Sequence, residues 1–289
     1  MVVFLRKIFV AEVAISGRVM QPNRRPTAPA TLCFALYAVC HAFLAILQWW
    51  YGGFDSYGSV IVIAIAIALV WDNGLLALGS TLFPEAANSR SRDFAKLVAL
   101  SQPRFFAHAL LTPLLALQAT RLGQRAGVTW LATGSTAERA VGLIACCLSI
   151  FGTMHHARHQ SLVLKRPHPK EPKGSWMRSI VSATLAETPP ITLAWMIGPA
   201  VLVCLWTMCV GISIARVYGE LRELAAITTH FHGPLGDVAG RWLWVCALIE
   251  LLSNAGPPWV MALTGNAGEV VLLAGFVAAE RELTAQGFR

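Results

Sequence analysis

The chain has 289 residues, 56% of them hydrophobic and only 13% charged, with a mean hydropathy of +0.58. Soluble domains carry about 25% charged residues, so this composition excludes an ordinary soluble protein and predicts an integral membrane protein. The formal net charge of +8 does not indicate a nucleic-acid partner, because the basic residues lie between apolar runs, where they orient membrane helices and contact anionic lipid. The seven cysteines all fall inside apolar runs and form no CxxC pair, which argues against disulfides and against a zinc module.

The N-terminal segment, residues 1–28, is basic and ends in several prolines. Two interpretations of it stay open. It is either a cleavable organellar targeting segment or a positively charged tail that stays on the protein. Residues 29–289 are expected to form one polytopic transmembrane domain.

The apolar runs predict an all-α bundle of about seven transmembrane helices, because a helix satisfies its own backbone polar groups in hydrocarbon. The predicted spans are about 31–50, 58–83, 104–119, 137–157, 191–215, 238–254 and 259–280.

Local signals define several helix ends. Ser101 and Pro103 are expected to start the third span, and Pro113 is expected to kink it. Ser135 and Glu138 have the spacing of a capping box that opens the fourth span. Residues 265–269 are expected to interrupt the last span early, because they contain two glycines and an asparagine.

The basic residues also predict an orientation. With seven spans, fifteen of the 23 Lys and Arg residues fall on the side of the N-terminus and eight on the other. The positive-inside rule therefore predicts that the N-terminus lies inside, in a bacterial inner membrane or an organellar membrane.

The most informative stretch is the second span, in which twelve uninterrupted apolar residues, 60–71, precede Asp72 and Asn73. A carboxylate inside a membrane helix costs about 2.5–3.5 kcal/mol on insertion scales and usually faces a partner or a cavity. In the seven-span arrangement several helices deliver polar groups to the same inner half of the bilayer. These residues form the predicted ligand site: Asp72, Asn73, His108, Glu250, Asn254, Asn266 and Glu269. The alternative is that each makes only a structural hydrogen bond.

Histidines suggest two further sites. His155 and His159 share a helix face and could ligate a metal, with a basic helix end at the lipid headgroups as the favoured alternative. His41 and His108 are candidate axial ligands for haem or chlorophyll, with hydrogen-bonded packing as the alternative. His230 and His232 belong to a loop on the opposite side of the bilayer from His155.

Six short motifs occur along the chain: WDNG at 71–74, ALG at 77–79, PRF at 103–105, HAL at 108–110, TP at 112–113 and GNAGE at 265–269. Together they resemble a loosely defined multi-pass membrane protein family of bacteria and plastid-bearing eukaryotes. The resemblance covers most of the chain after residue 30. It implies a shared fold and a plastid or bacterial membrane, and it implies no particular chemistry.

Three functional hypotheses follow. The leading one is a transporter-like protein that binds a small solute or cation at the predicted ligand site. The second is a membrane-embedded, metal-dependent enzyme that acts on a lipid-soluble substrate. The third is a non-catalytic, pigment- or haem-binding subunit associated with other membrane subunits.

Overall fold

The computed structural model describes residues 28–54, 56–83, 91–165, 190–227, 236–254 and 258–287. In these residues the regular structure is helical, and none of them forms a strand. The α-helices are α2 (Ala28–Gly52), α3 (Tyr57–Leu82), α4 (Arg92–Leu111), α5 (Leu115–Arg125), α6 (Thr136–Lys165), α8 (Pro190–Ile227), α9 (Gly236–Ser253) and α10 (Pro258–Ala285). Two 3₁₀ turns, η2 (Thr112–Leu114) and η3 (Thr129–Leu131), flank α5.

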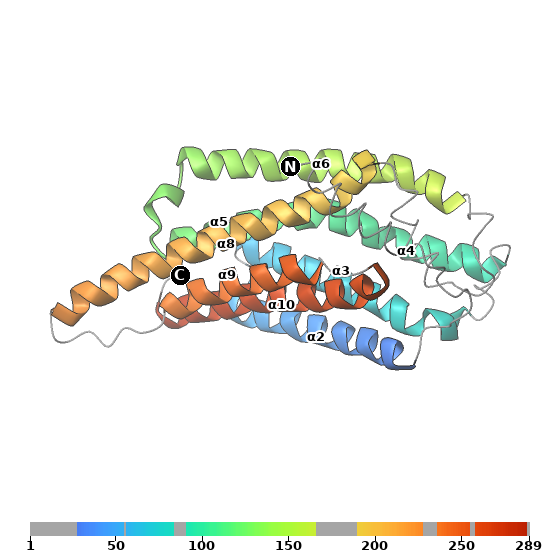
Figure 1. Cartoon of the computed structure of the whole chain (residues 1–289), viewed down its shortest axis with the longest axis horizontal. Helices are drawn as coiled ribbons and strands as arrows, with labels where there is room; N and C mark the ends of the chain where they lie inside the picture. The colour runs from blue at the N-terminus through green and yellow to red at the C-terminus, as the bar shows by residue number, and fades with distance from the viewer. Residues whose placement is uncertain are drawn as a thin grey trace.

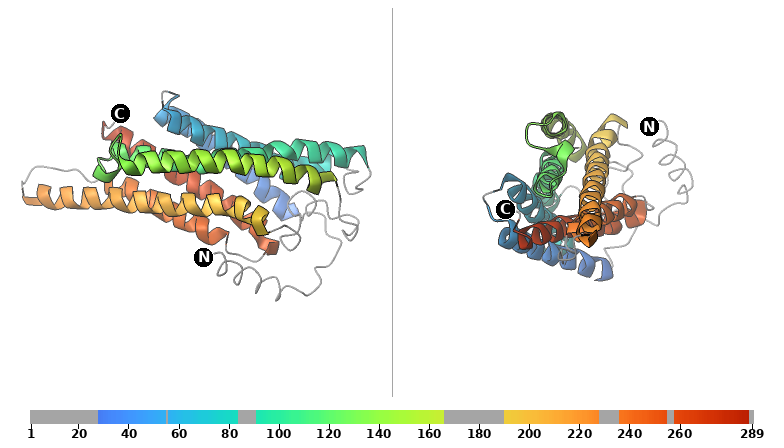
Figure 2. Two further views of the ribbon diagram at one scale, coloured as in Figure 1. Left: turned by 90° about the horizontal axis from the view of Figure 1, so that it is seen from above. Right: turned by 90° about the vertical axis from the view of Figure 1, so that its left-hand side faces the viewer.

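The helices run roughly along the long axis of the bundle (Figure 1). Helix α2 packs against α3 and α10, and α9 packs against both α8 and α10. Helix α6 packs mainly against α4 and lies on the opposite side of the bundle from α2 (Figure 2). The C-terminal part of α8 projects beyond the other helices at one end of the bundle (Figure 1).

Four helical segments are long and apolar enough to cross a membrane: Thr31–Gly52, Tyr57–Gly79, Thr136–His155 and Ile197–Gly219. The all-α fold is therefore confirmed for the described residues, and four of the predicted spans meet the criteria for a membrane helix. Helices α9 and α10 coincide with the predicted sixth and seventh spans. The number of seven spans is not confirmed and stays a prediction.

The surface of the bundle is apolar while its interior holds charge. Large apolar side chains are exposed on the outward faces of α2 and α6, among them Leu36, Phe43, Leu143 and Phe151. A soluble protein rarely exposes continuous apolar surface, whereas a lipid-facing helix must do so. This distribution supports a membrane setting.

The third predicted span differs from the structure. The prediction that Ser101 and Pro103 start this helix is wrong, because α4 already begins at Arg92 and contains Pro103. Asp93 in the first turn suits the positive end of the helix dipole. Pro113 does more than kink the segment: it lies in η2, which separates α4 from α5. A proline cannot donate a backbone hydrogen bond and clashes with the preceding turn, so the α-helix breaks there.

The predicted interruption at residues 265–269 is also wrong, because α10 is continuous from Pro258 to Ala285. A glycine inside a helix costs only about 1 kcal/mol, and close packing against a neighbouring helix offsets that cost.

The capping box at the start of α6 is present. The backbone N–H of Glu138 donates to Ser135 Oγ at 3.1 Å. The Glu138 carboxylate accepts from the backbone N–H of Gly134 and, at 2.9 Å, from Gln124 Nε2. The box therefore starts α6 and also ties it to the end of α5.

Candidate functional site

Glu250 is the best-defined member of the predicted ligand site. It lies near the C-terminal end of α9 and is only 5% exposed. Asn254 Nδ2 donates to Glu250 Oε1 at 2.8 Å, and Ser253 Oγ lies 3.3 Å from Glu250 Oε2. The carboxylate thus receives polar contacts from the end of its own helix, which lowers the cost of burying it.

Two glycines of α10 make room for this group. A Cβ added to Gly268 would lie 2.0 Å from both Glu250 Oε2 and Ser253 Oγ. A Cβ added to Gly265 would lie 2.9 Å from Asn254 Oδ1. The two glycines, which prompted the wrong prediction of a helix break, are the surface of α10 against which Glu250, Ser253 and Asn254 rest. Asn266, between them, is buried.

A second pair lies next to this group along α10. His108 Nδ1 of α4 is 3.7 Å from Glu269 Oε1, with the side chains 34% and 25% exposed. Since Glu269 directly follows Gly268, the pair lies at about the same depth in the bundle as Glu250. Helices α4, α9 and α10 therefore bring four predicted residues into one layer: His108, Glu250, Asn254 and Glu269.

Asp72 and Asn73 occupy the part of α3 that meets α2 and α4. Asp72 is 2% exposed and Asn73 has no exposed surface. Asn73 Nδ2 donates to Leu69 O of its own helix at 2.9 Å. The preceding Trp71 donates from Nε1 to Leu100 O of α4 at 3.0 Å, and Leu76 packs with Phe34 of α2 in a small apolar cluster. Asp72 is thus a buried carboxylate, and it makes polar or electrostatic interactions of its own.

The histidine sites are placed differently. His155 stacks on Trp195 of α8, with ring centroids 6.2 Å apart and an interplanar angle of 28°. Within the described residues, no group of three or more His, Cys, Asp or Glu side chains is arranged to hold a metal ion. The side chain of His159 and all of His230 and His232 lie outside the part that the structure describes.

His41 is fully buried in α2. A haem or chlorophyll bound there would require the surrounding helices to separate, since an axial ligand must present its ring nitrogen to the face of a macrocycle. Both interpretations of His41, an axial ligand and hydrogen-bonded packing, stay predictions.

The sequence interpretation missed a polar cluster at the other end of α10. Glu280 is 1% exposed and accepts from Gln118 Nε2 at 2.9 Å and from Arg121 Nη1 at 3.0 Å. Arg125 Nη1 also donates to this carboxylate. The available signal was the spacing of Gln118, Arg121 and Arg125, which share a face of α5.

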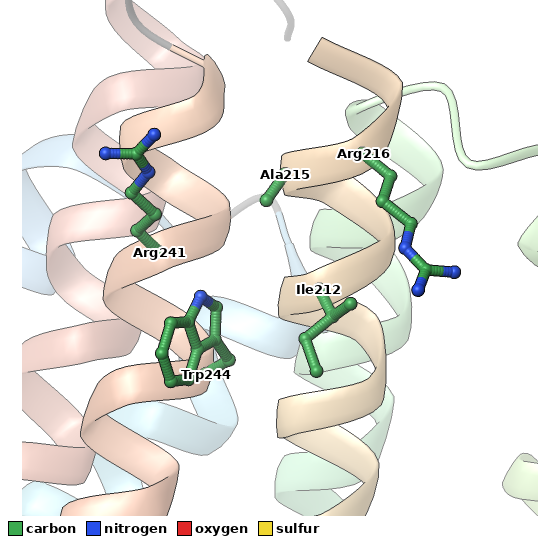
Figure 3. Close-up of a pocket in the computed structure, with 5 residues that line it drawn as sticks. All are labelled: Ile212, Ala215, Arg216, Arg241 and Trp244. Carbon is green, nitrogen blue, oxygen red and sulfur yellow. The ribbon is translucent and has the colours of Figure 1, made fainter. Parts of the chain in front are cut away.

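A surface groove between α8 and α9 is lined by Ile212, Ala215, Arg216, Arg241 and Trp244 (Figure 3). The guanidinium groups of Arg216 and Arg241 point away from each other, so they do not converge on a common ligand (Figure 3). No predicted site residue lines this groove.

Comparisons of the chain with protein-family models, with curated proteins and with solved structures give no match.

Proposed function

We propose that this chain is a transporter-like membrane protein that binds a small solute or cation at the layer formed by His108, Glu250, Asn254 and Glu269, with Asp72 as a further charged group. The observation that carries the proposal is the burial of the Glu250 carboxylate inside the bundle. An acidic side chain at such a position is expensive, and the cost is most readily explained by a functional role.

The chemistry of the layer supports binding. Gly265 and Gly268 leave the space that the side chains of Glu250, Ser253 and Asn254 occupy, so these polar groups pack directly against α10. Carboxylate and amide oxygens from Glu250, Asn254 and Asn266 are the ligands that hard cations prefer, and they also hold protonated or polar solutes. His108 beside Glu269 adds an imidazole that can donate or accept a hydrogen bond.

Movement of the helices would give access to the layer. Helix α4 ends at Leu111, three residues after His108, and η2 separates it from α5, so the two helices can change their relative angle there. Binding at the layer followed by rocking of helices is the mechanism that this arrangement favours.

A flux assay tests the proposal. Purified protein is reconstituted into liposomes, and uptake of ²²Na⁺ and movement of protons, reported by a trapped pH-sensitive dye, are measured for the native chain and for Glu250→Gln, Glu269→Gln and Asp72→Asn. We expect the native protein to move at least one of the two ions, and Glu250→Gln to reduce that flux to the level of protein-free liposomes.

Glu282→Gln is the matched control, because Glu282 lies on the same helix as Glu269 but at the partly exposed C-terminal end of α10. It should leave the flux unchanged. Equal flux in the native protein and in all three site variants would overturn the proposal, as would native flux no higher than that of protein-free liposomes for both ions.

A further inference from the structure

The cluster of Gln118, Arg121, Arg125 and Glu280, here called the clasp, joins α5 to α10 at one end of the bundle. All three donors on α5 converge on the one carboxylate of α10, Gln118 and Arg121 at Oε2 and Arg125 at Oε1. Glu280 and Gln118 are buried, and the two arginine side chains are 18% and 10% exposed. Two cations thus share one buried anion.

The clasp extends to a third helix. Arg125 Nη2 donates to Thr284 Oγ1 at 3.2 Å, and Thr284 Oγ1 in turn donates to Tyr51 O at the end of α2 at 3.4 Å. Gly58, at the start of α3, leaves the space that Gln118 occupies, because a Cβ there would lie 1.7 Å from Gln118 Oε1. The clasp therefore sits where α2, α3, α5 and α10 all meet.

A loop covers the adjoining side of α5. Leu131 of η3 is fully buried, and its Cδ1 lies 2.5 Å from the position of a Cβ on Gly123. Trp130 packs edge-on against Trp206 of α8, and Trp206 Nε1 donates to Thr120 Oγ1 at 3.0 Å. Helix α5 is thus enclosed by the clasp on one side and by the loop and α8 on the other.

Helix α5 is also built as a separate segment. It has 11 residues and is divided from α4 by η2, where Pro113 interrupts the α-helical hydrogen bonds. A short helix between two 3₁₀ turns can tilt as a unit without disturbing α4, which carries His108.

We propose that the clasp is a gate that closes this end of the bundle, and that α5 tilts away from α10 when the clasp opens. The closed state depends on a single carboxylate that holds two guanidinium groups together. If Glu280 loses its charge, the two cations of α5 remain buried side by side without an anion, and their repulsion favours outward movement of the helix. The role of the gate in transport rests on the proposed function, but its opening can be measured without any transported ion.

Cysteine accessibility tests the gate. All seven native cysteines are replaced, and Ala119→Cys, fully buried next to Gln118, serves as the reporter. A charged, membrane-impermeant thiol reagent is applied to vesicles of both orientations. With the clasp intact the reporter should react slowly from either side. With Glu280→Gln the reporter should react at least about tenfold faster, and from one side only. A tenfold change corresponds to a shift of about 1.4 kcal/mol in the equilibrium between the closed and open states.

Two controls separate opening from general loosening. A second reporter, Ala247→Cys, is fully buried in α9 away from the clasp and should stay unreactive in Glu280→Gln. Glu282→Gln should leave the reactivity of Ala119→Cys unchanged. A clasp that is only structural predicts a different result: Glu280→Gln lowers the melting temperature and either leaves both reporters slow or exposes both together, and that result would overturn the gate.

If Glu280→Gln does not fold, Glu280→Asp decides, since it keeps the charge but shortens the side chain that reaches both Arg121 and Arg125. It should raise the labelling rate of Ala119→Cys less than the loss of the carboxylate would, and an unchanged rate would overturn the gate. Because labelling needs no flux, one-sided labelling without ion movement would retain the gate and reject the proposed function. Ion movement with an unchanged labelling rate would support the proposed function and reject the gate.

Discussion

Gly211 and Gly240 allow α8 and α9 to touch backbone to backbone. A Cβ on Gly240 would lie 2.5 Å from Ala215 N and 2.6 Å from Gly211 O. A Cβ on Gly211 would lie 2.7 Å from Trp244 N. Small residues at such crossings are typical of membrane helices, which gain stability from close packing because lipid is as apolar as the side chains.

Gly240→Ala should therefore destabilise the protein. The neighbouring atoms belong to the backbone and cannot move without separating α8 from α9, so we expect a loss of about 1–3 kcal/mol, as for other overpacked sites. Thermal unfolding in detergent, followed by circular dichroism, measures it. Gly198→Ala on α8 is the control, because a Cβ there has open space around it. Equal melting temperatures for the two variants would show that the crossing is looser than the structure indicates.

For single residues, the sequence predicted which side chains are buried better than it predicted which residues they contact. Asp72 and Glu250 stand out as acids within apolar runs, and both are buried. Glu280 was expected only at the end of the last span, because its partners Gln118 and Arg125 lie 162 and 155 residues away in sequence. Pairings over such distances depend on how helices pack, which no local pattern encodes.

Among the elements, α5 differs most from expectation. The sequence predicted one kinked span over 104–119, whereas the structure has α4, η2 and α5, with α4 beginning at Arg92. Hydropathy locates apolar runs but does not decide whether a polar stretch before a run, such as residues 92–100, continues the same helix. The start of α6 was predictable because capping depends on residues only three apart.

Ser135→Ala should weaken the start of α6. The substitution leaves the Glu138 N–H without its acceptor, and loss of an N-cap costs about 1 kcal/mol. The measurement is the midpoint of thermal unfolding, with hydrogen exchange at residues 136–139 as the local readout. Ser135→Asp retains an N-cap acceptor and should stay close to the native protein. Unchanged exchange in both variants would mean that the Gln124–Glu138 contact, and not the cap, holds this turn.

At the scale of the whole molecule, the bundle combines an apolar exterior with two polar layers, one around Glu250 and one at the clasp. The two layers lie at different levels of α10. Gly268 packs against Glu250, whereas Glu280, twelve residues further along the helix, belongs to the clasp. Twelve residues of α-helix span about 18 Å, which is over half of a hydrocarbon core of about 30 Å. In the proposed transporter, the clasp would close access to the Glu250 layer from the opposite end of the bundle.

The turn after α2 and the turn after α5 should lie on the same side of the membrane. Both adjoin the clasp, because Tyr51 and Arg125 are each joined to Thr284 by hydrogen bonds.

Phe54 and Thr133 are exposed in these two turns, and Lys96 is exposed near the start of α4. In a chain without native cysteines, Phe54→Cys and Thr133→Cys should react with an impermeant thiol reagent from one side, and Lys96→Cys from the other. The positive-inside rule predicts that Lys96 lies on the inner side. Labelling of Phe54→Cys and Thr133→Cys from opposite sides would contradict the prediction that both turns lie at the clasp end of the bundle. It would also contradict a single crossing of the bilayer by α4 and α5 together.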